Sequence, residues 1–125
     1  MHQFLPYAWF EGKCVPFSEA NISIATHALH YGTAAFGGMR AIPNPSNSSE
    51  FLLFRTDKHI KRLTQSAKFL LTELKEDYVS NALEKIIKIN KPDKPIYIRP
   101  FVYTSDLGIA PRLHNIETNF FIYCI

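Results

Sequence analysis

The sequence predicts an α+β domain, a mostly antiparallel sheet with two helices packed on one of its faces. Segments with the character of strands lie near both ends of the chain, and two segments with helical periodicity lie between them. Hydrophobic residues make up 46% of the 125 residues and include 10 Phe and 6 Tyr, enough for one core. We therefore treat residues 1–125 as a single domain.

The first half of the chain contains four predicted strands. Residues 7–10 and 14–17 flank a turn with a glycine and predict a hairpin. Residues 39–42 predict a third strand, and residues 51–54 predict a buried fourth strand that pairs with it. Residues 43–49, rich in Pro, Asn and Ser, are expected to form the loop between the last two.

The strand predicted at residues 96–103 alternates strictly. Ile96, Ile98 and Val102 point to one face of the sheet. The residues of the opposite face are Tyr97, Arg99, Phe101 and Tyr103. A loop is expected at 105–111, followed by a last apolar strand at 119–125. Because natural C-termini are usually polar, we expect that the chain is truncated within this strand; a stop codon directly after Ile125 would count against this.

Two helices are predicted between these groups of strands, at residues 57–71 and 77–89. Thr56 is a candidate N-cap of the first, and Pro92 and Pro95 end the second, because neither proline could continue a helix. A spacing of 3.6 residues marks one apolar stripe on each helix. The stripes are Ile60, Leu63, Ala67, Leu70 and Leu71 in the first helix and Val79, Ala82, Leu83, Ile86 and Ile87 in the second.

The composition disfavours several classes of protein. The net charge is only +3 and the lysines are scattered, so we expect no nucleic acid and no membrane among the partners. No run approaches the roughly 18 apolar residues of a membrane span, and the N-terminus lacks a signal-peptide pattern, so we expect a cytoplasmic protein. Cys14 and Cys124 have no metal-ligand spacing, so we expect no metal site and two free, buried thiols, with one disulfide as the alternative.

No stretch of the sequence is a complete catalytic motif. Residues 27–40 combine small residues with Tyr, Phe and Arg, as a binding face would, and their glycines permit close backbone approach. Taken by itself, this segment is also typical of a bulged strand with ordinary packing. Both interpretations stay open on the residues alone.

This segment, HALHYGTAAFGGMR, resembles the hallmark segment of the branched-chain amino acid aminotransferases, which are pyridoxal-phosphate enzymes of fold type IV. The resemblance continues, in the family's order and spacing, through WFEG at 9–12, FRTDKHIKRL at 54–63, YIRP at 97–100 and DLG at 106–108. It covers nearly the whole chain. It implies the N-terminal small domain of such an enzyme, without the larger domain that carries the catalytic lysine.

The resemblance implies a cofactor-binding role for Arg62. This residue matches the arginine that holds the phosphate of pyridoxal 5'-phosphate in the family, and a guanidinium suits phosphate oxygens because its hydrogen bonds are bidentate and charge-assisted. The helical periodicity places Arg62 opposite the apolar stripe, beside Lys58, Lys61 and Gln65. A solvated basic face is the alternative.

Tyr97 and Arg99 match family residues of the substrate pocket. In the family the arginine can receive the distal carboxylate of glutamate, while aromatic rings receive a branched aliphatic side chain. The strand alternation independently places Tyr97 and Arg99 on one face. A buried arginine paired with an unseen carboxylate is the alternative for Arg99.

Further pocket residues follow from the resemblance. Phe36 and Tyr31 match substrate-binding residues, with Tyr31 expected to reach the site of the neighbouring subunit. Gly38 is expected to be critical for the conformation of the backbone at this point of the motif. Ile109 belongs to the loop that matches the segment capping the partner's pocket. His27 and His30, like Arg40, are interpreted as structural. Many members have Glu at the position of Gly37, a departure that concerns substrate choice rather than family.

The implied activity is transfer of the amino group of Leu, Ile or Val to 2-oxoglutarate, in branched-chain amino acid biosynthesis. The implied assembly is a homodimer or higher oligomer. None of the lysines of this chain matches the family's Schiff-base lysine, so no catalytic residue is assigned and the isolated chain is expected to be inactive. The alternatives are D-amino acid aminotransferase, aminodeoxychorismate lyase, or a non-catalytic dimerising module.

Overall fold

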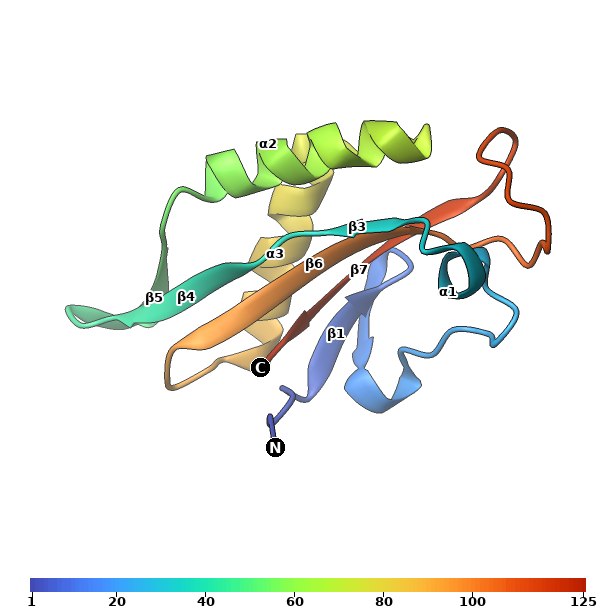
Figure 1. Cartoon of the computed structure of the whole chain (residues 1–125). Coiled ribbons are helices and arrows are strands. Elements are labelled where there is room, and N and C mark those ends of the chain that lie inside the picture. Colours follow the sequence, from blue (N-terminus) through green and yellow to red (C-terminus); the bar gives the residue numbers. More distant parts are fainter.

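The computed structural model describes residues 1–125 and contains one antiparallel sheet with two longer helices on one face (Figure 1). The strands are β1 (Tyr7–Phe10), β2 (Lys13–Pro16), β3 (Ala34–Phe36), β4 (Met39–Asn44), β5 (Asn47–Leu53), β6 (Ile96–Thr104) and β7 (Thr118–Cys124). The α-helices are α1 (His27–Tyr31), α2 (Thr56–Ala67) and α3 (Glu76–Asn90), and two 3₁₀ turns lie at η1 (Phe17–Glu19) and η2 (Lys68–Leu70). The α+β prediction is confirmed.

The strand order is β2-β1-β7-β6-β4-β5, and β3 also pairs with β6. The predicted hairpin is present as β1 and β2, with Trp9 opposite Cys14. The last strand of the chain, β7, lies inside the sheet between β1 and β6, and Ile122 is opposite both Trp9 and Pro100. The two ends of the chain are therefore paired within one sheet.

The core lies between the sheet and the helices α2 and α3. Both helices contribute to one buried cluster, to which Leu63 of α2 and Ile86 of α3 belong together with Ile98 and Ile122 of the sheet. Burial of such side chains contributes roughly 1.5–3 kcal/mol each. The predicted stripes are confirmed for Ile60, Leu63, Ala67, Leu70, Val79, Ala82, Leu83 and Ile86, all of which are buried.

Three details of the first helix differ from the prediction. Thr56 is the first residue of α2 and not its N-cap; the cap position is taken by Arg55 in a left-handed conformation, with φ 51° and no side-chain cap. The helix ends at Ala67 and continues only as the 3₁₀ turn η2. Leu71 has a φ of 54°, which turns the chain away from the helix, and it is 69% exposed instead of buried.

The strand predicted at 51–54 is longer and less buried than expected. β5 pairs with β4 alone, so it is an edge strand, and Leu52 is 53% exposed. The expected loop at 43–49 is mostly strand, because β4 extends to Asn44, which pairs with Asn47 at the start of β5. Only a tight turn separates them.

Residues 27–40 are not one bulged strand. They begin as the short helix α1, which ends at Gly32 with φ 64°, and continue as β3 and β4 on either side of Gly37 and Gly38. No helix of the structure combines the length and the apolar composition that a membrane crossing needs.

Candidate functional site

Aromatic rings line the face of the sheet opposite α2 and α3. Phe36 of β3, Phe101 of β6 and Phe121 of β7 stack across three strands: the ring centres of the first two are 6.0 Å apart, and those of the last two are 4.7 Å apart. The planes are nearly parallel, at 4° and 7°. The result is a flat apolar surface of the kind that an aliphatic side chain can contact.

Arg99 lies beside this stack without an acidic partner. Its guanidinium carbon is 4.4 Å from the ring centre of Phe36 and 5.3 Å from that of Tyr97. Its Nε donates a hydrogen bond of 3.0 Å to Tyr97 Oη. The ion pairs of the structure are Lys58–Asp57 and Lys88–Glu84, so no carboxylate of this chain pairs with Arg99.

Gly38 makes room for the ring of Tyr97. A Cβ added to Gly38 would lie 2.9 and 3.0 Å from two carbons of that ring and still closer to its hydroxyl oxygen. Real Cβ atoms do not approach other atoms this closely. The structure thus gives Gly38 a local role: the absence of a Cβ permits the close approach of the Tyr97 side chain.

A cavity of about 660 Å³ opens next to this pair. Tyr97 and Gly38 form part of its wall, and His59 of α2 contributes from the helix side. The remaining lining residues are Met39, Arg40, Ile42, Leu52, Leu53 and Phe54. The prediction did not include His59, although its position three residues before Arg62 places the two on neighbouring parts of one helix face.

Arg62 is exposed on α2, and its guanidinium takes part in no hydrogen bond or ion pair. The helical spacing predicted this exposure. Arg62 lies one turn after His59 on α2, but it is not among the residues that line the cavity. The Arg62 guanidinium is therefore free to bind an anion.

Tyr31 and Ile109 contact each other. The hydroxyl of Tyr31 donates to the carbonyl oxygen of Ile109, whose side chain is 85% exposed. Next to them, His27 is fully buried and hydrogen-bonded through both ring nitrogens. His30 donates to the carbonyl of Ile24 over 2.8 Å. The structural roles predicted for both histidines are confirmed.

Two groups have strongly shifted acidity. Burial raises the pKa of Tyr103 to about 12, with a further increase from the negative charge of Glu11. Burial also raises the pKa of Cys124 to about 12. The pKa of Cys14 is raised as well, again because of burial. These groups therefore stay protonated at neutral pH. Cys14 and Cys124 are both free thiols.

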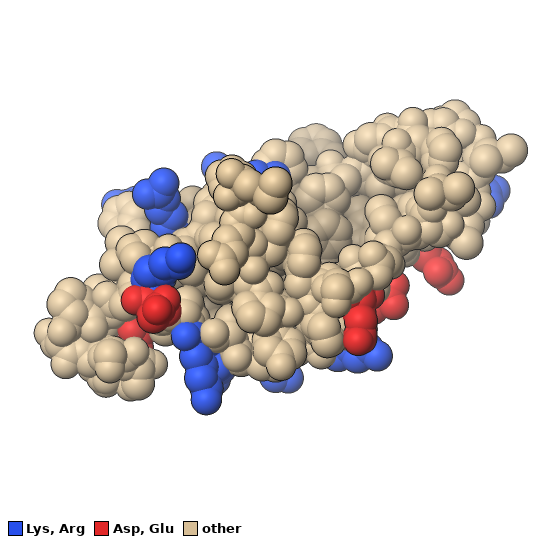
Figure 2. All heavy atoms as spheres, turned by 90° about the horizontal axis from the view of Figure 1, so that it is seen from below, with Lys and Arg blue, Asp and Glu red and all other residues tan.

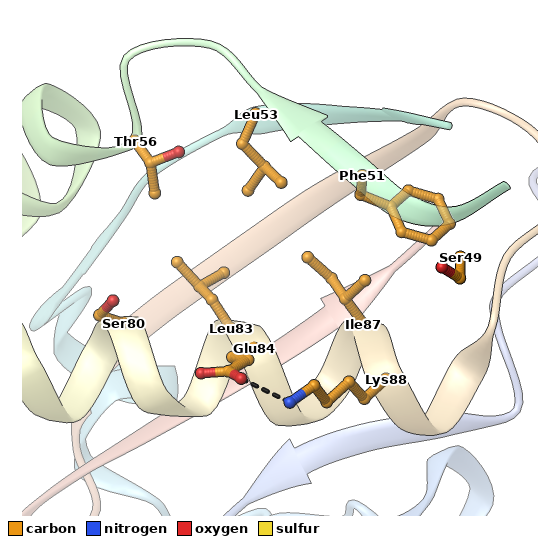
Figure 3. Close-up of a pocket in the computed structure, with 9 residues that line it drawn as sticks. All are labelled: Ser49, Phe51, Leu53, Thr56, Ser80, Leu83, Glu84, Ile87 and Lys88. Carbon is orange, nitrogen blue, oxygen red and sulfur yellow. Dashed lines mark hydrogen bonds and ion pairs between the residues drawn. The ribbon is translucent and has the colours of Figure 1, made fainter. Parts of the chain in front are cut away.

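A second cavity of about 310 Å³ lies between β5 and α3 (Figure 3). Phe51 and Leu53 face Leu83 and Ile87 across it, and the ion pair of Glu84 and Lys88 lies at its rim. None of the predicted site residues lines it.

Charge is dispersed on the face of the molecule opposite α2 (Figure 2). Seen from the side opposite α2, most of the surface is uncharged, and cationic and acidic groups are interspersed on the rest (Figure 2). This side offers no continuous basic surface of the kind that nucleic-acid binding uses. No three His, Cys, Asp or Glu side chains are grouped as metal ligands would be.

The chain was compared with family models, curated proteins and solved structures. No family model matches the chain. A Synechocystis protein named probable branched-chain-amino-acid aminotransferase is 57% identical over 98% of this chain. The branched-chain aminotransferase of Thermoproteus uzoniensis, solved with norvaline, superposes with a TM-score of 0.87 at 27% identity over 98% of this chain.

A branched-chain amino acid aminotransferase from T.th. superposes with a TM-score of 0.83 at 31% identity over 96% of this chain. It was solved with N-(5'-phosphopyridoxyl)-L-glutamate and, in another crystal, with 4-methylvaleric acid. This chain covers 40% of the Synechocystis protein, 41% of the Thermoproteus structure and 40% of the T.th. structure. The chain therefore spans about two fifths of the length of the relatives it matches.

Proposed function

Because this chain belongs to the branched-chain-amino-acid aminotransferase family and has the fold of its small domain, we propose that it supplies one wall of a transaminase active site. The proposed reaction transfers the amino group of Leu, Ile or Val to 2-oxoglutarate with pyridoxal 5'-phosphate as cofactor. The proposed setting is a cytoplasmic homodimer or larger assembly active in branched-chain amino acid biosynthesis.

The observation that carries the proposal is the arrangement of Arg99. A transaminase for these substrates must accept an aliphatic side chain in one half-reaction and a distal carboxylate in the other. Arg99 has no acidic partner, and only its Nε is engaged, by Tyr97. Its terminal nitrogens remain free for a carboxylate, while the neighbouring ring of Phe36 offers an apolar surface.

Arg62 is proposed to hold the cofactor phosphate. The T.th. relative was solved with a phosphopyridoxyl compound, so a phosphate site is expected in the family. An exposed arginine without an acidic partner fits a phosphate group. When bound, the cofactor supplies the electron sink that makes the α-proton of the substrate acidic.

Gly38, Tyr31 and Ile109 are the remaining proposed substrate-binding residues. Gly38 allows Tyr97 to keep its position beside Arg99, as the close approach of the two residues supports. The hydrogen bond between Tyr31 and Ile109 holds the two residues together, and both are proposed to contribute to the pocket of a neighbouring subunit.

The complete gene product should produce glutamate from leucine and 2-oxoglutarate in the presence of pyridoxal 5'-phosphate. Preference for D-alanine would assign it to the D-amino acid aminotransferases, and release of pyruvate from aminodeoxychorismate to the lyases. Absence of all three activities would favour a non-catalytic dimerising module.

Substitution of Arg99 by Leu tests the pocket. We expect the KM for glutamate to rise about 10- to 100-fold, because a charged hydrogen bond is lost, while the KM for leucine changes about threefold or less. The leucine half-reaction of the same variant is the internal control. Equal losses for both substrates would contradict the proposed role of Arg99.

The isolated 125-residue chain should not transaminate, because none of its lysines matches the Schiff-base lysine. The measurement mixes the purified chain with pyridoxal 5'-phosphate, leucine and 2-oxoglutarate and follows glutamate. Turnover that persists through purification would show that a catalytic lysine is present after all.

A further inference from the structure

A buried histidine joins three segments that are far apart in the sequence. His27 has no exposed surface, and its Nε2 is 2.9 Å from the carbonyl oxygen of Ala110. Its Nδ1 is 2.8 Å from the hydroxyl of Thr33 and 3.0 Å from that of Thr104, the last residue of β6. The ring therefore links α1, the segment that leads into β3, and the loop after β6.

The partners of the ring select one tautomer. A carbonyl oxygen can only accept, so Nε2 must carry the proton that is donated to Ala110. In the neutral ring Nδ1 is then an acceptor, and the adjacent hydroxyls of Thr33 and Thr104 supply the donor. Thr104 Oγ1 also lies 3.3 Å from the carbonyl oxygen of Thr33, which gives its hydroxyl an alternative acceptor. No polar atom of this buried group lacks a partner.

The loop after β6 is closed at its base by the Ser105 N–H, which donates to the carbonyl oxygen of Glu117 over 2.9 Å. It contains no helix or strand between Thr104 and Thr118. Three carbonyl groups of the loop accept hydrogen bonds from the short helix α1. The His27 backbone N–H donates to Asp106 over 2.8 Å, and the His27 ring donates to Ala110. The Tyr31 hydroxyl donates to Ile109. These bonds keep the loop against α1 while the side chain of Ile109 remains exposed.

We propose that His27 is a positioning residue that fixes the loop 106–110 through its Nε2–H tautomer and so sets the place of Ile109. The importance of Ile109 for a substrate pocket rests on the proposed function. The attachment of the loop rests only on the hydrogen bonds of this chain.

Amide hydrogen exchange of residues 106–112, measured on the whole chain, tests the attachment. His27→Leu should accelerate exchange in this loop at least about tenfold relative to the core strands, because the loop loses a buried hydrogen bond. His27→Gln, whose amide can still donate to Ala110, should restore much of the protection. His30→Gln is the matched control on the same helix, since His30 bonds to Ile24, and it should leave the loop unchanged.

The tautomer of His27 can be tested by NMR on the unmodified chain, so this test remains possible if His27→Leu does not fold. The ¹⁵N shifts of the His27 ring should show a protonated Nε2 and an unprotonated Nδ1. A protonated Nδ1 with an unprotonated Nε2, or equal loop exchange in folded His27→Leu and the unmodified chain, would overturn the proposal.

In the complete gene product, His27→Gln should keep the KM for leucine within about threefold of the unmodified value, and His27→Leu should raise it about tenfold. Faster loop exchange with an unchanged KM in His27→Leu would overturn the link to the pocket. Amide exchange can be measured without any turnover. Absence of transamination would therefore contradict the proposed function but would not affect the exchange test of the loop attachment.

Discussion

At the scale of single residues, Gly38 shows how a missing side chain positions a functional one. A Cβ at this position would meet the ring of Tyr97, whose hydroxyl accepts the hydrogen bond from Arg99. Gly38→Ala should therefore displace the ring, break this hydrogen bond and lower the free energy of unfolding by about 1–3 kcal/mol, the cost of overpacking. Urea unfolding of the chain measures the change.

The adjacent glycine is the matched control for this substitution. A Cβ on Gly37 would lie 3.4 Å from Pro100 Cγ, a distance that the structure can accommodate. Gly37→Ala should change the free energy of unfolding by about 0.5 kcal/mol or less, because it creates no serious overlap and slightly reduces the entropy of the unfolded chain. Equal effects of the two substitutions would show that the Tyr97 ring is not the cause.

At the scale of elements, the attachment of α2 to the sheet depends on which of its leucines face the core. Leu63 is 2% exposed and belongs to the buried cluster, whereas Leu71 lies beyond the end of the helix and is 69% exposed. Leu63→Ala should lower the free energy of unfolding by about 2–5 kcal/mol, because the helix loses buried contacts and leaves a cavity.

Leu71→Ala removes the same atoms from a position outside the core. It should change the free energy of unfolding by about 0.5 kcal/mol or less. Thermal or urea unfolding of both variants makes the comparison. A large loss in Leu71→Ala would mean that residue 71 packs as the helical periodicity of the sequence predicts.

At the scale of the whole molecule, the stability of the fold should depend on pH in the alkaline range. Burial raises the pKa of Cys124 from 9.0 to about 12 and that of Tyr103 from 10.0 to about 12. The folded state therefore retains protons that the unfolded state releases. The stabilisation is fully present below about pH 9 and is lost as pH rises towards 12, at up to about 1.4 kcal/mol per pH unit for each group.

Unfolding free energies at pH 8, 9, 10 and 11 measure this dependence. Cys124→Ala lowers stability at every pH by the lost packing, but its decline with pH should be shallower, since one of the two titrating groups is absent. A decline equally steep in the variant would show that the thiol of Cys124 is not responsible.

Local patterns predicted how three residues of the proposed site are oriented, while their proposed roles came from the family resemblance. The alternation along β6 placed Tyr97 and Arg99 on one face, and the periodicity of α2 placed Arg62 in solvent. Contacts between elements could not be predicted in this way. The stacking of Phe36 on Phe101 follows from the pairing of β3 with β6, and the threonine and carbonyl partners of His27 come from segments up to 83 residues away.

By itself, the sequence determined the character of each element: the hairpin of β1 and β2, the buried faces of α2 and α3, and the alternation of β6. These depend on repeats of 2.0 or 3.6 residues, which are local properties of a chain. Only the tertiary structure decided that β7 is central and β5 lies at the edge, that Gly38 accommodates Tyr97, and that His27 holds a distant loop. Strand order and long-range hydrogen bonds depend on which distant segments pack together, and periodicity carries no information about that choice.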